Sequence, residues 1–289
     1  MPAPDILAAA VVNGLAIGAV YALISVGLTL VYGVLHIINF AHGAMLGAAM
    51  FAAYFAHEAG VDPYLAMVPL AALFFVLGYG VQRLVIGPAS HGDDRSALLV
   101  TLGLAIVIEN LLLAVFSSDT RTIDTPYGFA TLDLGFTLLS VPKAAGFAVS
   151  CVTGAALWGL LALSDTGKAI RAVARERMGA ALAGIDPPHV FAVTFGLSAA
   201  CLALAACLLL PIYYVHPRVG EAYVLIAFTT VVLGGMGSIP GAMIGGLFLG
   251  VVESLSGLFM GDSLGQLGIY LIFILVLLMR PRGLFGAGA

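Results

Sequence analysis

Residues 6–33 read ILAAAVVNGLAIGAVYALISVGLTLVYG, an apolar run that contains no charged side chain. A helix of about 20 apolar residues is long enough to cross the hydrocarbon core of a membrane. No Lys or Arg precedes this run, and it is much longer than the hydrophobic core of a signal peptide. The run therefore predicts a membrane-spanning helix that is retained in the mature protein.

The rest of the sequence has the same character. Hydrophobic residues make up 62% of the 289 residues, charged residues make up 9%, and the mean hydropathy is +1.12. Soluble domains contain roughly 45–50% apolar and about 25% charged residues, so a soluble fold could not bury this much apolar surface. The composition predicts an all-α fold, a polytopic bundle of transmembrane helices. The 36 glycines would let these helices pack closely.

Apolar runs bounded by charged or turn-forming residues predict about eight spans. The expected spans are residues 6–33, 37–57, 63–82, 97–116, 143–163, 189–210, 241–258 and 264–279. The run 222–233 is too short to cross a membrane, and it leads into LGGMGSIPG at 233–241. Backbone that is broken in this way is tolerated at membrane depth only inside protein or beside water. We expect a broken or re-entrant segment near 222–241, within a single transmembrane domain that covers residues 1–289.

The short loops carry the basic residues unevenly, and Lys and Arg favour cytoplasmic loops. Eight of the eleven Lys and Arg residues fall in loops on one side of the membrane: Arg83, Arg95, Lys168, Arg171, Arg175, Arg177, Arg280 and Arg282. The other face has Arg121, Lys143 and Arg218. This asymmetry predicts an amino terminus outside and a carboxyl terminus in the cytoplasm. The connection 117–142 is expected to form an ordered loop over the outer mouth of the bundle.

Signatures of catalysis, metal binding and nucleic-acid binding are not found in the sequence. The net charge is −4 and the cations are scattered, so no basic face for nucleic acid forms. A phosphate-binding loop needs a glycine five residues before its Gly-Lys pair, and Ala162 stands there instead. The three cysteines lack the spacing of a zinc site. We expect no catalytic residue, no metal, no cofactor and no ATP hydrolysis by the chain itself.

Ionisable residues inside the expected spans are few, and the clearest are Glu109 and Glu253. Because a charge within a membrane is costly, such residues are functional candidates. Both lie within a turn or two of a predicted outer end. The alternative is that each side chain simply reaches water.

The connection 164–188 is the most informative loop. Arg171 and Arg175 lie four residues apart, opposite an apolar stripe, which predicts a basic amphipathic helix. A second short helix of small residues is expected next, ended by Gly184 and stopped by the prolines at 187–188. One interpretation is a helix on anionic lipid. The other is a segment that inserts into a groove of a cytoplasmic partner, which the small side chains favour.

Several motifs, in this order along the chain, resemble the permease subunits of ATP-binding-cassette importers for branched-chain amino acids and related small polar compounds. They are NGL at 13–15, GLTL at 27–30, NFAHG at 39–43, TLGL at 101–104, TGKAIRA at 166–172, GGMGSIPGA at 234–242 and RPRGLFG at 280–286. The NFAHG form and the short amino terminus resemble the shorter of the two paralogous permeases in such systems.

The resemblance implies a place in the bacterial inner membrane among lipid, with a second permease, two ATPase subunits and a periplasmic substrate-binding protein. It also implies that 164–188 is a cytoplasmic coupling loop that occupies a groove of the ATPase. The candidate coupling residues are Arg171, Arg175, Ala180, Ala181, Gly184 and Ile185. The alternative is a self-sufficient secondary transporter or channel, although the chain shows no connected relay of charged residues. The sequence does not choose among leucine-type amino acids, other amino acids, urea and amides.

Two segments are candidates for the path of the solute: 234–241, which interrupts a helix, and 39–42, which opens one. Broken helices expose backbone amides and carbonyls that can contact a polar solute. The candidate path or gate residues are Asn13, Asn39, Phe40, His42, Gly234, Gly235, Gly237 and Ser238. We expect 39–42 and 234–241 to face each other near the interface between the permeases. The alternative is that the glycines only allow close helix packing.

Overall fold

Helices form almost all of the chain in the computed structural model, which describes residues 4–90, 93–261 and 264–279. In chain order they are α1 (Pro4–Leu35), α2 (Ala41–Glu58), α3 (Pro63–Val81), the π-helix η1 (Gln82–Ile86), α4 (Gly87–Ser90), α5 (Asp94–Phe116), α6 (Val141–Leu163), α7 (Asp165–Arg175), α8 (Arg177–Leu182), α9 (Pro187–Leu209), α10 (Gly220–Gly234), α11 (Ile239–Met260) and α12 (Gly265–Met279). Strands β1 (Thr131–Asp133) and β2 (Leu138–Ser140) pair as an antiparallel hairpin. The prediction of an all-α polytopic bundle is confirmed, and the hairpin is a small addition to it.

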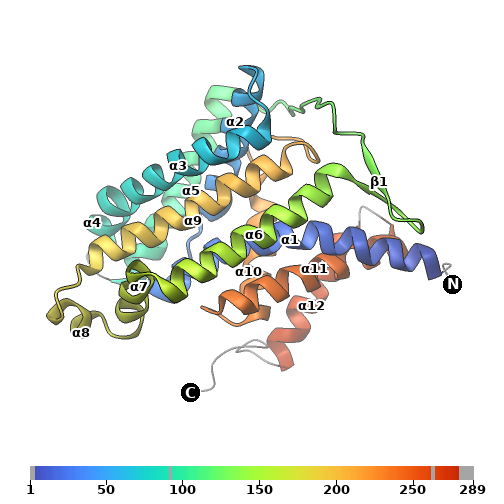
Figure 1. Cartoon of the computed structure of the whole chain (residues 1–289). Helices are drawn as coiled ribbons and strands as arrows, with labels where there is room; N and C mark the ends of the chain where they lie inside the picture. The colour runs from blue at the N-terminus through green and yellow to red at the C-terminus, as the bar shows by residue number, and fades with distance from the viewer. Residues whose placement is uncertain (1–3, 91–92, 262–263, 280–289) are drawn as a thin grey trace.

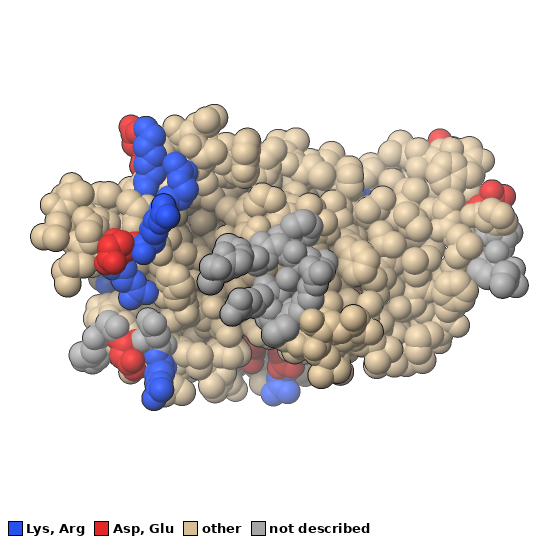
Figure 2. All heavy atoms as spheres, turned by 90° about the horizontal axis from the view of Figure 1, so that it is seen from below, with Lys and Arg blue, Asp and Glu red and all other residues tan. Residues whose placement is uncertain are grey.

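The long helices run roughly along one direction of an elongated molecule, with α7 and α8 at one end and the hairpin toward the other (Figure 1). Lys and Arg side chains gather at the end that holds α7 and α8 (Figure 2). We call this the basic end, and its cations are Arg83, Arg95, Lys168, Arg171, Arg175 and Arg177. The opposite end is called the hairpin end. Of the eleven basic residues, Arg280 and Arg282 lie outside the described residues, so six of the nine described ones lie at the basic end.

Six described helical segments are long and apolar enough to cross a membrane. They are Pro4–Leu35, Pro63–Ser90, Arg95–Phe116, Val141–Leu163, Pro187–Leu209 and Ile239–Met260. Helices α10 and α12 have 15 residues each, about 22 Å of helix, which is shorter than a hydrocarbon core of about 30 Å. A multi-pass membrane protein is therefore confirmed, whereas the count of about eight crossings stays a prediction.

Glycine contacts hold the central helices together. A Cβ on Gly14 of α1 would lie 2.7 Å from the carbonyl oxygen of Gly250 on α11, and one on Gly18 would lie 2.7 Å from that of Gly246. Helix α9 is the most buried span, and its Phe195 is completely enclosed. Without a hydrophobic effect between helices in lipid, this close backbone approach supplies packing energy.

Two boundaries differ from the expected ones. The second helix begins at Ala41 and not near residue 37, because residues 36–40 leave the helical path. The prolines at 187–188 do not stop the preceding helix but form the first turn of α9. Proline suits that position because the first amide groups of a helix have no partner to donate to. Gly184, with φ +86°, ends the α8 turn as expected.

The connection 117–140 crosses the hairpin end as an ordered loop. Arg121 and Val215 exchange backbone hydrogen bonds of 2.9 and 2.8 Å, which ties this loop to the α9–α10 connection. Tyr127 donates its hydroxyl hydrogen to Asp62 Oδ2 at 2.8 Å. Burial and this bond to a carboxylate raise the pKa of Tyr127. The loop is thus anchored to both α3 and the 211–219 connection.

Candidate functional site

The first turn of α2 lies deep inside the bundle. His42 Nε2 donates to the carbonyl oxygen of Ile24 at 2.9 Å, and Ile24 precedes Leu35, the last residue of α1, by 11 residues or about 16 Å of helix. After α1 ends, the chain therefore turns back into the protein before α2 starts. Thr101 on α5 supports this turn by donating to Leu98 O at 2.9 Å while its oxygen lies 3.4 Å from the amide of Phe40.

The α9–α10 connection makes the complementary turn from the other side. Gly220 begins α10 against Gly43 of α2, and a Cβ on either glycine would overlap the backbone of the other. The amino termini of two helices that run in opposite directions thus meet inside the bundle. Their amide groups create a positive potential at this point, which Glu221 in the first turn of α10 partly offsets. Discontinuous helices of this kind commonly form solute sites in transporters.

A cavity of about 780 Å³ opens beside this meeting point toward the hairpin end. Tyr21 of α1 and Tyr223 of α10 pack edge to face with ring centroids 6.2 Å apart, and Tyr213 joins them at 6.5 Å from Tyr223. Glu253 of α11 and Arg218 add charges of both signs to the wall. A concave site with aromatic walls and a few polar groups can hold a small amphipathic molecule.

The break between α10 and α11 lies near the basic end. Gly235 and Gly237 have φ angles of +91° and +86°, which L side chains rarely adopt. Ser238 then caps α11, its Oγ accepting from the amide of Gly241 at 3.2 Å. Gly237 packs against Gly33 of α1. The glycines therefore serve both as a turn and as a close contact.

The segment from α7 to α8 projects from the basic end. Ser164 Oγ accepts from Gly167 N at 3.0 Å and starts α7, whose Ile170 and Val173 are buried against the bundle while Arg171 and Arg175 face outward. The predicted amphipathic helix is confirmed.

Arg177, at the start of α8, anchors the segment. It donates to the carbonyl oxygen of Leu35 at 2.8 Å and lies 5.1 Å from the ring centroid of Phe191. Beyond it, the side chains of Met178 and Leu182 are 71% and 85% exposed. They lie four residues apart on α8, so they form one apolar face that the fold leaves open.

The predicted coupling residues divide by exposure. Ala181 and Gly184 are exposed beside Leu182, whereas Ala180 is buried and accepts from the amide of Ile185 at 3.0 Å. Ala180 therefore shapes the segment from inside and offers no surface. The apolar pair Met178 and Leu182 was missed, although its spacing of four residues is visible in the sequence.

The predicted path residues are not all brought together. Asn39 and His42 are both buried, His42 beside Ile24, and Asn39 Oδ1 accepts from Ala41 N at 3.1 Å. Gly237 and Ser238 lie about 14 Å further along α1, at the level of Gly33. Between the two segments, Ile38 and Met236 line one small apolar pocket together with Tyr32, Leu28, Phe228 and Val231. Their assignment to a path stays a prediction.

The remaining candidates lie nearer the hairpin end. Asn13 accepts from Lys143 Nζ at 3.1 Å, away from the other path residues. Glu253 lines the large cavity, and Glu109 lines a smaller groove beside Phe40 and Gly220. The three tyrosines of the cavity were missed, because they come from segments that only the fold brings together. Among the described residues, no group of three or more His, Cys, Asp or Glu side chains is placed to hold a metal ion.

Comparison with known proteins gives consistent results. The family described as "Branched-chain amino acid transport system / permease component" matches residues 10–279. The permease protein BraD of a high-affinity branched-chain amino acid transport system in Pseudomonas aeruginosa is 34% identical over 95% of this chain and 94% of its own length. The corresponding LivH of Escherichia coli K12 is 33% identical over the same shares. The ribose import permease RbsC of Bacillus subtilis is 28% identical over 77% of this chain and 69% of its own length.

Proposed function

The chain belongs to the family of permease components of branched-chain amino acid transport systems, and from this premise we propose that it forms, with a second permease, the translocation path for branched-chain amino acids. As a member of this family it is a transport subunit of an ATP-binding-cassette importer and not an enzyme. ATP would be hydrolysed by two separate ATPase subunits, and a periplasmic binding protein would deliver the substrate.

The observation that carries this proposal is the projecting segment α7–α8. Arg177 ties it to the end of α1, so a force on α8 reaches the central helix of the bundle. The exposed face of Met178 and Leu182 would fill a groove in an ATPase subunit. The basic end is cytoplasmic in this proposal, because cytoplasmic loops collect Lys and Arg.

The large cavity fits the chemistry of an aliphatic amino acid. The rings of Tyr21, Tyr213 and Tyr223 would contact the hydrocarbon side chain. Glu253 would pair with the ammonium group, and Arg218 or the amino termini of α2 and α10 would attract the carboxylate. The substrate would enter from the hairpin end, which faces the periplasm in the proposed orientation.

Reconstitution tests the proposal. The chain is co-expressed with a second permease, two ATPases and a periplasmic binding protein of a branched-chain amino acid transport system, and the purified complex is placed in proteoliposomes. We expect concentrative leucine uptake that requires both ATP and the binding protein. Concentrative uptake by this chain alone would instead establish the secondary transporter. Uptake of ribose or urea with no uptake of leucine would refute the substrate class.

A further inference from the structure

A strip of exposed side chains runs along α5 on the outside of the bundle. It consists of Leu102, Ile106, Glu109 and Leu113, which are spaced four, three and four residues apart and therefore lie on one face of the helix. Leu113 also lines the large cavity, so the strip begins at the wall of that cavity. From there the strip, which we call the α5 strip, follows α5 toward the basic end.

A groove between α5 and α10 joins the α5 strip to the large cavity. Glu109 of α5, Gly43 of α2, and Glu221 and Leu225 of α10 line this α5–α10 groove, and Glu221 lines the large cavity as well. The first turns of α2 and α10 form part of its wall, and the first amides of a helix have no carbonyl partner within that helix. Lipid tails offer no hydrogen bonds, so backbone of this kind must face protein or water.

Glu109 lies at membrane depth and has no partner within the described part of the chain. Ala105 is the midpoint of α5, and Glu109 follows it by four residues, about 6 Å of helix. Among the described residues, no side chain or backbone group forms a hydrogen bond or ion pair with the Glu109 carboxylate. Arg218 pairs with Glu221 instead, at 3.8 Å. A carboxylate at this depth is costly in lipid, so such residues face protein or a water-filled path.

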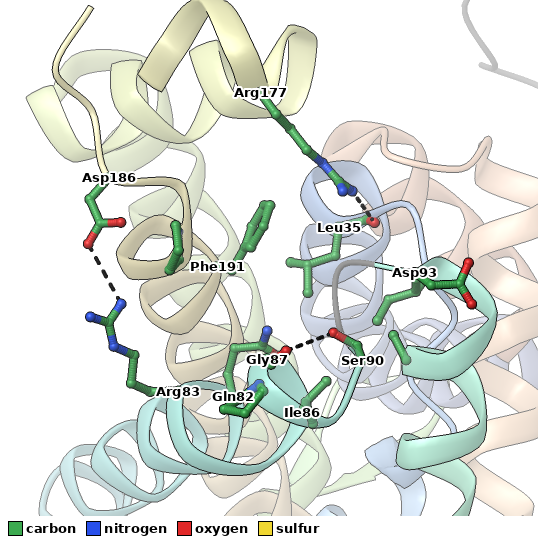
Figure 3. Close-up of a pocket in the computed structure, with 14 residues that line it drawn as sticks. Leu35, Gln82, Arg83, Ile86, Gly87, Ser90, Asp93, Arg177, Asp186 and Phe191 are labelled. Atoms are coloured by element: carbon green, nitrogen blue, oxygen red, sulfur yellow. Dashed lines mark hydrogen bonds and ion pairs between the residues drawn. The ribbon is translucent and has the colours of Figure 1, made fainter. Parts of the chain in front are cut away.

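Charged side chains at the basic end, by comparison, find partners within the chain. Figure 3 shows Arg83 directed at Asp186, with 3.6 Å between Nη1 and Oδ2. The same view shows Arg177 directed at the carbonyl oxygen of Leu35, at 2.8 Å. Glu109 differs from these groups, because its partner has to come from another molecule.

The exposed side of α3 shows what a lipid-facing surface of this bundle is like. Helix α3 contains no charged residue, and its Leu65, Val68 and Val76 side chains are strongly exposed. Lipid tails solvate such a surface as well as protein does. The α5–α10 groove carries two carboxylates and therefore needs a different cover.

We infer that the second permease covers the α5 strip and the α5–α10 groove, and that it places a hydrogen-bond donor opposite Glu109. The inference rests on the proposed function, which includes a second permease, and it adds the surface on which that subunit sits. This cover closes the groove that connects the large cavity to the outside of the bundle. A solute in the cavity then passes between the two permeases without meeting lipid.

The charges of this surface favour a permease of different sequence over a second copy of the chain. Glu109 and Glu221 supply two carboxylates, and the one guanidinium near them, Arg218, already pairs with Glu221. Both subunits of a two-fold dimer use the same patch, so a second copy would bring the same excess of negative charge. A helix with a Lys, Arg, Asn or Gln side chain at the matching depth would complement Glu109.

Photo-crosslinking in the complete complex tests which face the second permease covers. The photoreactive residue p-benzoylphenylalanine replaces Ile106 of the α5 strip or Leu225 of the groove, whose side chains are 54% and 51% exposed. The control replaces Val76 on α3, which is 65% exposed. We expect illumination at either test position to join the chain to the second permease in at least tenfold higher yield than at Val76. Products with lipid alone, with a second copy of this chain, or with the second permease only at Val76 would overturn the inference.

Glu109→Ala tests the donor opposite the carboxylate. We expect the dissociation constant of the two detergent-solubilised permeases to rise at least fivefold, while the thermal unfolding temperature of this chain alone stays the same. The matched control is Val107→Ala, because Val107 is 59% exposed on nearly the opposite side of the same helix. It should bind the second permease normally. Unchanged binding in Glu109→Ala, or an equal loss in the control, would refute the position of the donor.

Leucine uptake by the same complexes separates failure of this inference from failure of the proposed function. Leucine import by a complex that gives no cross-link to the second permease at Ile106 or Leu225 would overturn the interface and leave the proposed function intact. Cross-links at both positions in a complex that imports no branched-chain amino acid would support the interface and refute the proposed function.

Discussion

Leu182→Ala should weaken the association of the permease with its ATPase subunits by about 30-fold. The Leu182 side chain is 85% exposed in this chain, so the substitution opens no cavity in the fold. If a partner buries the side chain, the change removes three carbon atoms from the contact, worth about 2 kcal/mol. A loss of about 1.4 kcal/mol is a factor of ten in affinity, which gives the expected figure.

The assay is the dissociation constant of the ATPase for the detergent-solubilised pair of permeases. Leu163→Ala serves as the matched control, because Leu163 is also strongly exposed at the basic end but lies at the end of α6, outside the projecting segment. The control should bind the ATPase normally. Unchanged affinity in Leu182→Ala, or an equal loss in Leu163→Ala, would refute the assignment of α8 as the docking element. Gly184 is a poorer test site, because its φ of +86° makes any side chain there strain the turn itself.

Three further outcomes are expected. The purified chain alone should show no ATPase activity above that of an empty preparation, since it lacks a phosphate-binding loop, and a rate that follows the chain through purification would contradict this. Gly43→Ala should sharply lower the thermal unfolding temperature and the yield, because its Cβ would overlap the backbone of Gly220. The control Gly103→Ala, with open space around it, should fold normally. Equal stability of the two variants would show that the close contact between α2 and α10 does not stabilise the fold. Glu253→Gln should raise the KM of leucine uptake about 10- to 100-fold, since a hydrogen bond to a charged group contributes about 1.5–3 kcal/mol. An unchanged KM would show that the ammonium group of leucine does not bind at Glu253.

The sequence alone was sufficient to predict the features that depend on local composition. A run such as 6–33 has to be a helix in lipid, because every backbone amide must be paired within its own segment. The amphipathic spacing of Arg171 and Arg175 was sufficient to predict the helix α7, and the glycines of 233–241 were sufficient to predict the break before α11. Periodicity, turn chemistry and charge act over a few residues and can be read directly.

The tertiary structure decided where these elements meet. The sequence gives no sign that the chain turns back after Leu35, that Gly43 would meet Gly220, or that Tyr21, Tyr213 and Tyr223 share one cavity. The packing of an apolar helix in a membrane depends on small shape differences, since every face of such a helix is apolar and lipid is as apolar as protein. Hydropathy therefore determined that this chain is a membrane bundle, whereas the close contacts between glycine backbones determined the shape of its sites.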